Sequence, residues 1–496
     1  MTRLSLEALP ALPAEVAQPA YDIRAARVGI VHLGVGAFHR AHQAVYVDDR
    51  LAAGETDWAI CGASLRSAET NHALEPQNGL YTVAVLSAEG DALRVVGSLR
   101  RLIVAPADPQ ALLSVMCDPR VRIVTLTVTE KGYCHDPATC RLDETHPDIR
   151  RDLRGPHAPS SAPGFIVEAL ARRRMGGAAP FTVLSCDNLP SNGATARNVV
   201  TRLAALRDRD LGRWVEDEVA FPSTMVDRIV PATTDEDRAQ VAAQLGAEDA
   251  WPVVTEPFSQ WVVENHFPSH RPRFEECGAT MVANVAPYEL AKLRLLNGSH
   301  STLAYLGCLA GYETIADAMA DANFARLISE LMETESAPTL DAAAAGDLKP
   351  YMRELQARFR NPALRHRTWQ IAMDGSQKLP QRLLGTVRAR LAKNQPIDRL
   401  ALGVAAWMRY VTGIDEKGHP INVRDPLAAR LRAIADREGL DAARLARALA
   451  DVREVFGADL AGDSRFLSPV TAALAKLIAM GSRRTVEHYA SIRDRE

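Results

Sequence analysis

An α/β N-terminal domain followed by a mostly α-helical C-terminal domain is the fold class that the sequence predicts. Three observations predict it. The chain has 496 residues, which is more than one ordinary hydrophobic core requires. Apolar, β-branched runs alternate with helical patterns in the first part, which is typical of a largely parallel sheet. Long Ala/Leu/Arg patterns of helical period follow, with hardly a strand. We expect a domain boundary between residues 284 and 285.

The composition excludes several classes of partner. Hydrophobic residues make up 47% and charged residues 24% of the chain, and the formal net charge is -3, so nothing attracts nucleic acid or an anionic membrane in general. No run approaches the roughly 18 apolar residues of a membrane span, and Pro and Glu interrupt the N-terminal segment where a signal peptide is apolar. Seven scattered cysteines fit reduced thiols. We expect a cytoplasmic protein with a small-molecule partner.

One group of potential metal ligands stands out in the sequence. It consists of Cys134, His135, Asp136 and Cys140. The group lacks the paired C-x-x-C spacing of structural zinc sites, which favours an ordinary surface loop. We therefore expect no metal site, and a zinc-dependent alcohol dehydrogenase is disfavoured.

The first strand leads into a glycine turn. Residues 27–33 (RVGIVHL) form an apolar run, residues 34–40 (GVGAFHR) follow, and a helical pattern continues through Leu51. Strand, glycine turn and helix in this order predict a Rossmann-like dinucleotide-binding domain, in which backbone N–H groups contact the pyrophosphate. An ordinary tight turn is the alternative, because the third glycine position is His39. The cofactor-binding residues expected here are Gly34, Gly36, Ala37, Phe38, His39 and Arg40, the last two adding positive charge.

The second strand, residues 58–63, is expected to end beside the adenosine ribose. An Asp or Glu at this point marks NAD. The sequence has Ser64 instead and, two residues later, Arg66. These residues leave NAD and NADP both open.

Ligands of parallel α/β sheets bind beyond the carboxyl ends of the strands. Further strands are expected at residues 81–86, 121–128 and 181–185, and helices at 111–117 and 165–174. The rule singles out Glu130 and residues 185–188 (SCDN), which end in Asn188. The Asn188 amide can donate to a substrate oxygen or cap the helix that follows Ser191. Asp227, next to Arg228, is expected in a buried ion pair or in the wall of a cleft.

Residues 287–311 predict one long buried helix with four polar side chains. At about 100° per residue, Glu289, Lys292, Asn297 and His300 share one side of an α-helix. Desolvation disfavours the charged form of a buried lysine and lowers its pKa, which makes Lys292 a candidate general acid/base. The alternative is a lysine that reaches solvent from a helix kinked at Asn297 and Gly298.

A second polar segment, residues 358–381, offers possible substrate contacts or a solvated basic face. The candidates are His366, Arg367, Gln370 and Lys378. Later helical patterns cover residues 323–335, 381–393, 400–411, 426–437, 442–455 and 469–480.

Several motifs together resemble the polyol-specific long-chain dehydrogenases, the mannitol dehydrogenase family. The matching stretches are residues 34–43 (GVGAFHRAHQ), 127–133 (TVTEKGY), 185–188 (SCDN), 221–228 (FPSTMVDR), 292–300 (KLRLLNGSH) and 374–378 (DGSQK). They occur in order over most of the chain. The resemblance implies an NAD(P)-dependent, metal-independent oxidoreductase that acts on a secondary alcohol in a cleft between two domains, with a preference for NAD.

The resemblance also implies roles for individual residues. It makes Lys292 the general acid/base, Asn188 and Asn297 donors to the substrate oxygen, and His300 an orienting residue. Glu289 and Glu130 match acidic positions associated with proton movement and closure, and Asp227 matches a cleft residue. Tyr288 and Lys292 also show the Tyr-x-x-x-Lys spacing of short-chain dehydrogenases, but chain length and the downstream Asn297 and His300 argue against that fold.

The substrate segment departs from the mannitol-type pattern. Mannitol-type members have an arginine eight residues before Lys378, and this chain has Gln370. The segment resembles the fructuronate reductase (D-mannonate oxidoreductase) branch, in which Lys378 or Arg367 would pair with a uronate carboxylate. This favours fructuronate/mannonate over fructose/mannitol or another polyol such as arabinitol. A nucleotide-sensing protein on the same fold is the non-enzyme alternative. The oligomeric state stays open.

Overall fold

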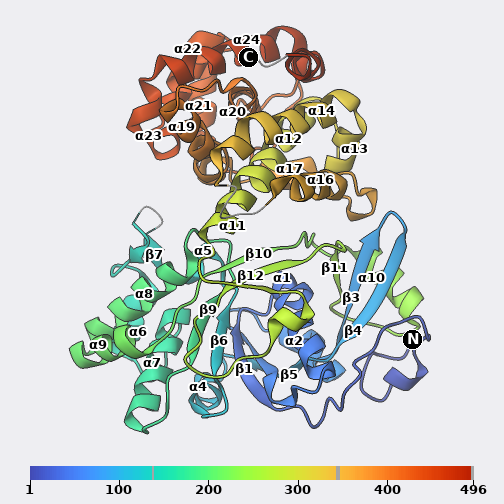
Figure 1. Ribbon diagram of the computed structural model, residues 1–496, viewed down its shortest axis with the longest axis vertical. Helices are drawn as coiled ribbons and strands as arrows, with labels where there is room; N and C mark the ends of the chain where they lie inside the picture. Colours follow the sequence, from blue (N-terminus) through green and yellow to red (C-terminus); the bar gives the residue numbers. More distant parts are fainter. Residues whose placement is uncertain (137–138, 342–346, 493–496) are drawn as a thin grey trace. The chain divides into compact units, whose positions relative to one another are not determined.

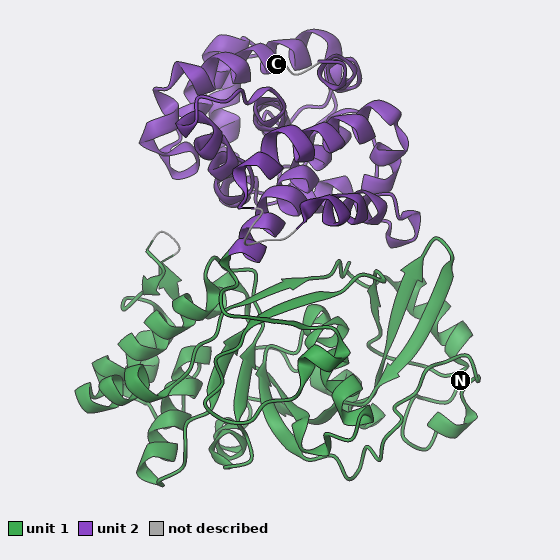
Figure 2. Ribbon diagram, viewed as in Figure 1, with its two compact units in different colours: residues 1–286 green, residues 287–496 purple. Residues whose placement is uncertain are grey.

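The chain divides into two compact units. The structure, a computed structural model, describes residues 1–136, 139–341 and 347–492. The units are Met1–Ala286 and Pro287–Glu496 (Figure 2). The boundary expected from the sequence lies two residues earlier in the chain. The alanine run at 342–345 lies outside the described residues.

A five-stranded parallel sheet forms the centre of the N-terminal unit (Figure 1). The strand order is β5-β2-β1-β6-β9, so the order reverses between β1 and β6. Ligands of such sheets bind at this reversal, outside the carboxyl ends of the strands. The strands are β1 (Val28–Leu33), β2 (Ala59–Ser64), β5 (Leu99–Val104), β6 (Ile123–Leu126) and β9 (Thr182–Ser185).

Both faces of this sheet are buried. Val31 and Leu33 pack into one apolar cluster with α4, α7 and α8, whereas Ile30 belongs to a second cluster with α2 and β3. A strand covered on both sides requires a nearly continuous apolar run, which explains the sequence of β1. The helices of the unit are α1 (Ala37–Ala41), α2 (Gln43–Ala52), α3 (Glu69–Leu74), α4 (Pro109–Cys117), α5 (Thr129–Gly132), α6 (Pro147–Arg154), α7 (Ala162–Met175), α8 (Asn192–Arg207), α9 (Arg209–Glu218) and α10 (Asp235–Leu245).

Two three-stranded sheets accompany the parallel one. The strand expected at residues 81–86 is present, but it lies in a different sheet from the five parallel strands. The strand β3 (Tyr81–Ser87) pairs antiparallel with β4 (Gly90–Val96) and parallel with β11 (Val253–Thr255), because a short turn reverses the chain between Ser87 and Gly90. The third sheet contains β10 (Thr224–Asp227), β12 (Gln260–Glu264) and β13 (Thr280–Val282).

The helix after the glycine turn is interrupted. The sequence predicts one helix through Leu51, whereas α1 ends at Ala41 and α2 begins at Gln43. His42, between them, has φ -123° and ψ -93°. Its Nε2 donates to the Gln260 carbonyl on β12 at 2.9 Å. The break and this contact with a distant strand occur at the same residue. No local sequence pattern reveals the contact.

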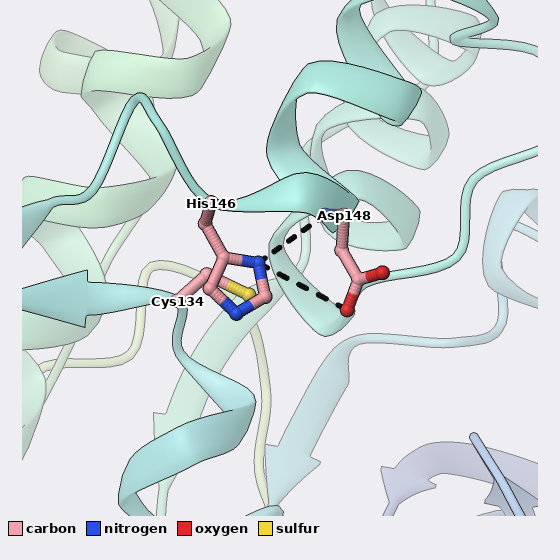
Figure 3. Close-up of side chains that lie close together, drawn as sticks. All are labelled: Cys134, His146 and Asp148. Atoms are coloured by element: carbon pink, nitrogen blue, oxygen red, sulfur yellow. Dashed lines mark hydrogen bonds and ion pairs between the residues drawn. The ribbon is translucent and has the colours of Figure 1, made fainter.

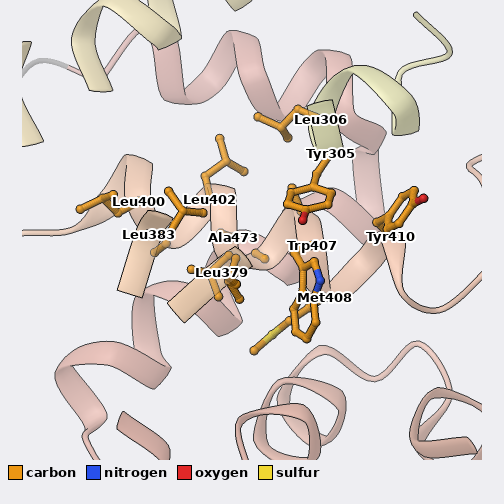
Figure 4. Packing of buried hydrophobic residues seen from close by; sticks show 14 of the residues in the cluster. Tyr305, Leu306, Leu379, Leu383, Leu400, Leu402, Trp407, Met408, Tyr410 and Ala473 are labelled. Atoms are coloured by element: carbon orange, nitrogen blue, oxygen red, sulfur yellow. The ribbon is translucent and has the colours of Figure 1, made fainter. Parts of the chain in front are cut away.

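The described part of the C-terminal unit is helical. Its long buried helix α20 packs against α12 and α24 around a core that includes Tyr305, Trp407 and Tyr410 (Figure 4). None of the described helices has the length and apolar character needed to cross a membrane. The helices are α11 (Ala286–Ala291), α12 (Gly298–Leu309), α13 (Ile315–Ala320), α14 (Ala322–Glu330), α16 (Leu348–Phe359), α17 (Thr368–Ala372), α18 (Gly375–Leu379), α19 (Gly385–Ala392), α20 (Asp398–Tyr410), α21 (Ala428–Glu438), α22 (Ala442–Ala450), α23 (Arg453–Ala461) and α24 (Ser464–Ala490).

Helical segments of this unit contain π turns. These turns span Lys292–Asn297, Leu331–Ser336 and Pro380–Leu384. The long helix expected at residues 287–311 is therefore α11, a π turn and α12 in succession. Single π turns inside α-helices are rare and occur frequently at functional sites.

Candidate active site

The glycine turn at the end of β1 has two glycines with different roles. Gly34 has φ +97°, and a Cβ atom there would lie 2.2 Å from the Thr127 carbonyl oxygen, so only glycine fits. A Cβ at Gly36 would meet nothing within 4 Å. The open space beside Gly36 is what a pyrophosphate needs in order to approach the backbone. These two glycines fit a dinucleotide cofactor.

The histidine of the turn carries no charge. His32, on β1, contacts Thr125 Oγ1 at 2.7 Å and Thr127 Oγ1 at 2.9 Å, and burial lowers its pKa to about 3. His39 stacks on it with a centroid separation of 3.3 Å, and burial holds the pKa of His39 well below its usual value. The expectation that His39 adds positive charge beside the phosphates is therefore wrong.

The guanidinium of Arg40 contacts other residues of the N-terminal unit. Arg40 is buried, donates to the Trp251 carbonyl and lies 5.3 Å from the Tyr81 ring centroid. These contacts direct it to β3 and the loop before β11. This geometry does not support the expectation that the charge of Arg40 acts beside the phosphates. The backbone of Ala37, Phe38, His39 and Arg40 follows Gly36 directly.

Arg228 joins the end of β10 to the end of α1. Its guanidinium donates to the Ala41 carbonyl, at the end of α1, and to the Glu256 carbonyl. The preceding Asp227 is buried at 3% exposure and ends β10. For Asp227 and Arg228, the sequence leaves two alternatives, a buried ion pair and the wall of a cleft. The observed contacts show that Arg228 helps to position α1.

The loops after β6 and β9 are connected by one carboxylate. Asp187 accepts hydrogen bonds from the backbone N–H groups of Val128 and Thr129, each at 2.9 Å, and from the Tyr133 hydroxyl at 2.8 Å. Burial raises its pKa to about 6. Glu130, in α5, and Asn188 adjoin these bonded residues and are both exposed. Asp187 thus positions the two loops that the sequence singles out.

Asn188 does not cap the following helix. The N-cap of α8 is Ser191, three residues later, so the cap alternative is wrong. The residue that sequence reasoning missed is Asn192, whose side chain donates to the Asp187 carbonyl at 3.0 Å and the Thr224 carbonyl at 2.9 Å. It also accepts from the Thr224 N–H at 2.9 Å, which joins β9 to β10. In the sequence, the pair Asn192-Gly193 is typical of a turn, so this contact is not expected.

Lys292 begins a π turn in the C-terminal unit. Its exposure is 8%, and Glu289 and Asn297 are half-buried nearby in the chain. The Gly298 N–H donates to the Leu293 carbonyl, five residues earlier. The sequence predicts about 140° between Lys292 and Asn297 around an α-helix, and the i→i+5 winding of the π turn changes that angle.

A glycine lets a second π turn approach this one. A Cβ at Gly298 would lie 2.7 Å from the Arg382 carbonyl oxygen, in the turn Pro380–Leu384. Arg382 in turn donates to Ser301 Oγ at 3.1 Å. Residues far apart in the sequence are thereby fixed beside α12.

His300, on α12, is a neutral buried imidazole. Its ring stacks on Phe359 and meets His366 edge-on, each at a centroid distance of 4.9 Å. Burial holds the pKa of His300 well below its usual value, and burial lowers that of His366 to about 4. His300 Nε2 and His366 Nδ1 have no hydrogen-bond partner among the described residues. Two unsatisfied ring nitrogens are suited to hydrogen bonds with a polar ligand.

Basic side chains surround His300. Arg382, Arg358 and Lys378 each act on it as positive charges and help to lower its pKa. Lys378 donates from Nζ to the Met373 carbonyl at 2.5 Å. The sequence identifies Lys378 as a candidate but not the two arginines, because Arg358 lies before the motif at residues 374–378 and Arg382 lies after it.

Arg367 and Gln370 differ from Lys378 in their surroundings. The Arg367 guanidinium forms an ion pair with Glu313, and the backbone of Arg367 bridges to Thr314. Gln370 is half-buried in α17. The pairing of Arg367 with a carboxylate of the protein argues against its expected role toward a substrate carboxylate.

A cluster of potential metal ligands forms elsewhere in the N-terminal unit (Figure 3). It contains Cys134, His146 and Asp148, and shares only Cys134 with the sequence-local set around β7 (His135–Asp136) and β8 (Arg141–Leu142). His146 Nδ1 accepts the Asp148 N–H at 3.2 Å and caps α6. Burial raises the pKa of the Cys134 thiol to about 12, which disfavours the thiolate. The geometry favours a helix cap.

Comparisons with known proteins cover nearly the whole chain. Residues 28–276 match the Mannitol dehydrogenase Rossmann domain, and residues 284–478 match the Mannitol dehydrogenase C-terminal domain. The chain is 48% identical to the uncharacterized oxidoreductase YdfI of Escherichia coli (strain K12) over 480 residues, which are 96% of this chain and 98% of the relative. It is 48% identical over 476 residues to the D-mannonate oxidoreductase of the same strain, with 95% and 97% covered.

A solved structure agrees with these sequence similarities. The Pseudomonas fluorescens mannitol 2-dehydrogenase, solved as a ternary complex with NAD and D-mannitol, superimposes with a TM-score of 0.89. Its sequence identity is 38%, and the match covers 98% of this chain and 99% of that chain.

Proposed function

Because the chain belongs to the mannitol dehydrogenase family of oxidoreductases, we propose that it interconverts a keto sugar acid and its polyol acid, D-fructuronate and D-mannonate. The D-mannonate oxidoreductase relative supports this substrate class. The observation that carries the choice is the set of cations around His300, because a carboxylate is the feature that distinguishes a sugar acid from a neutral polyol.

A nicotinamide dinucleotide fits the N-terminal unit. Gly34 and Gly36 give the turn the backbone and the open space that a pyrophosphate needs. When bound, the nicotinamide supplies or accepts the hydride. The chain's own task is to hold the substrate and to move the hydroxyl proton.

The side chains of the Lys292 helix suit that task. A neutral amine at Lys292 accepts the hydroxyl proton during alcohol oxidation, and the ammonium returns it during ketone reduction. The amides of Asn297 and Asn188 donate to the substrate oxygen as negative charge develops. His300 orients a substrate hydroxyl through its unsatisfied Nε2, and Glu289 and Glu130 serve proton movement and closure.

The cationic set accounts for the substrate class. Lys378 and the two arginines act on the same imidazole, so an anionic group bound at His300 gains from all three charges. Gln370 replaces the arginine of the mannitol-type pattern within the same segment. A neutral ketose has no group that benefits equally from these charges.

Mannitol 2-dehydrogenase activity is the second candidate. The superposition with an enzyme that was solved with D-mannitol favours it. We expect kcat/KM for D-fructuronate to exceed that for D-fructose by at least about tenfold, the effect of one charge-assisted hydrogen bond. A preference for fructose would reject the sugar-acid assignment and keep the family activity.

Matched variants locate the carboxylate site. Lys378→Met is expected to raise KM for fructuronate roughly tenfold and to change KM for fructose little, because only the uronate carries the carboxylate. Arg367→Met is the control, since its guanidinium already pairs with Glu313. Equal losses with both substrates would show that Lys378 serves the fold instead.

A nucleotide-sensing protein is the remaining alternative. Lys292, Asn188, Asn297 and His300 are all present, which favours an enzyme. Purified protein that binds NADH but oxidises no polyol or aldonate would support the sensing role.

A further inference from the structure

The first acidic residue after the carboxyl end of β2 is Glu69, which begins α3. Ser64 is the last residue of β2, and residues 64–68 read SLRSA without a carboxylate. The Gly34 N–H donates to the Ala63 carbonyl at 2.9 Å, so this strand end lies directly beside the glycine turn. In this fold the position faces the adenosine ribose of the cofactor.

The side chains at this strand end are hydrogen-bond donors without partners. Among the described residues, neither the Ser64 hydroxyl nor the Arg66 guanidinium makes a hydrogen bond or an ion pair. Ser67 Oγ accepts the Glu69 N–H at 3.1 Å, which leaves its own hydroxyl hydrogen to donate outward. Arg66 and Ser67 are exposed, and Ser64 is 9% exposed. The set offers donors and one full positive charge.

The position of Arg66 also matters. Its charge acts on the Cys134 thiol, which follows α5 beyond the end of β6. The guanidinium therefore lies near the loops at the carboxyl edge of the sheet, on the side where the cofactor is expected. An arginine in this place accommodates a 2′-phosphate, because it presents paired N–H groups to the phosphate oxygens.

We propose that Ser64, Arg66 and Ser67 form a binding site for the 2′-phosphate of NADP(H), so that this chain prefers NADP(H) to NAD(H). The inference rests on the proposed function, because it concerns the cofactor of that reaction. It departs from the preference for NAD that the family resemblance implies. The Arg66 guanidinium is a charged donor without acceptor capacity, so it binds a phosphate dianion better than a neutral hydroxyl.

Two nucleotides that differ only in the 2′-phosphate test the site without turnover. Isothermal titration of the full-length protein with adenosine 2′,5′-bisphosphate and with 5′-AMP is expected to give at least about tenfold tighter binding of the bisphosphate, as for a charge-assisted hydrogen bond. Arg66→Gln is expected to remove most of this difference and to leave 5′-AMP binding unchanged. Arg209→Gln, at an exposed arginine that begins α9, is the control and is expected to behave as wild type.

The outcomes separate the inference from the proposed function. Equal affinity for the two nucleotides, or tighter binding of 5′-AMP, overturns the 2′-phosphate site and leaves the dehydrogenase assignment intact. A bisphosphate preference that survives Arg66→Gln also overturns it. Absence of binding by both nucleotides contradicts the dinucleotide site altogether, and with it the proposed reaction. NADPH and NADH fluorescence titrations give a second readout, in which NADPH is expected to bind more tightly.

Discussion

The glycine turn of the N-terminal unit and the Lys292 helix of the C-terminal unit achieve positioning in different ways. The turn depends on backbone: Gly34 adopts positive φ against the Thr127 carbonyl, and Gly36 leaves open space. The helix depends on irregular winding and on distant contacts: a π turn spans Lys292–Asn297, and charged residues from distant segments act on His300. A local glycine pattern reveals the first arrangement, whereas the second follows from contacts that no local pattern contains.

The largest expected effect is at Gly34. In Gly34→Ala, the new Cβ would overlap a backbone oxygen at 2.2 Å in a backbone conformation with φ +97°. We expect a loss of roughly 3 kcal/mol or more of unfolding free energy, because neither the strain nor the overlap can relax through a side chain. Urea denaturation measures it. Gly36→Ala is the control: it should keep the unfolding free energy within about 1 kcal/mol and weaken NAD(P)H binding. Equal stability of the two variants would contradict the distinction between the glycines.

A buried carboxyl in the helical unit should produce a pH effect. Glu335 accepts the N–H groups of Arg399 and Leu400 at 2.8 and 2.9 Å, and burial raises its pKa to about 7. The folded state then binds a proton more readily than the unfolded state, so this group's contribution to stability is present below about pH 4.5 and is lost as pH rises to about 7. The loss is on the order of 3 kcal/mol.

Glu335→Gln isolates this contribution. The variant cannot titrate at this position, so its unfolding free energy should fall less between pH 5 and pH 8 than that of the wild type. Asp187, whose pKa is also raised, remains in both proteins and cancels in the comparison. Identical pH slopes in urea unfolding would show that Glu335 does not carry the shift.

A smaller effect is expected where the two π turns meet. In Gly298→Ala, the methyl group would press on the Arg382 carbonyl oxygen at 2.7 Å. Overpacking of this size costs about 1 to 3 kcal/mol, and the displaced turn carries Arg382. We expect a lower melting temperature together with a higher KM for the sugar acid, measured by calorimetry and steady-state kinetics. Unchanged kinetics in a destabilised variant would limit this contact to a structural role.

The smallest expected effect is at Arg367. Its partner Glu313 has a side-chain exposure of 71%, and solvent screens such a pair. Arg367→Ala should change the unfolding free energy by less than about 1 kcal/mol. Its kcat/KM for fructuronate should stay within a few-fold of wild type. A loss of tenfold or more specific to the uronate would restore Arg367 as the carboxylate ligand.

Much of the fold can be predicted from the sequence, because its signals are local. The β1 run, the glycine turn and the alternation of strands and helices predict the Rossmann-type sheet and the helical second part, and the structure confirms both. The errors arise where distant residues decide. His42 is bonded to β12, and the hairpin after Tyr81–Ser87 takes that strand into another sheet.

The candidate site can be predicted only in part for the same reason. Lys292, Asn297 and His300 lie within nine residues of one another, so the sequence singles them out together. The π turn that spans Lys292–Asn297 has no recognisable sequence signal. Asn192, Asp187 and Arg382 act through partners on other elements, and Arg40 and His39 look like phosphate ligands until their burial is known.

The acid/base role of Lys292 is tested most directly by single-turnover kinetics of ketose reduction with saturating NAD(P)H. Lys292→Ala is expected to slow hydride transfer by several orders of magnitude, as expected when a general acid and its placement are both lost, with NAD(P)H affinity unchanged. Tyr288→Phe, four residues earlier, is expected to retain nearly the full rate. Rapid transfer in Lys292→Ala together with a severe loss in Tyr288→Phe would contradict the assignment and make the tyrosine the proton donor.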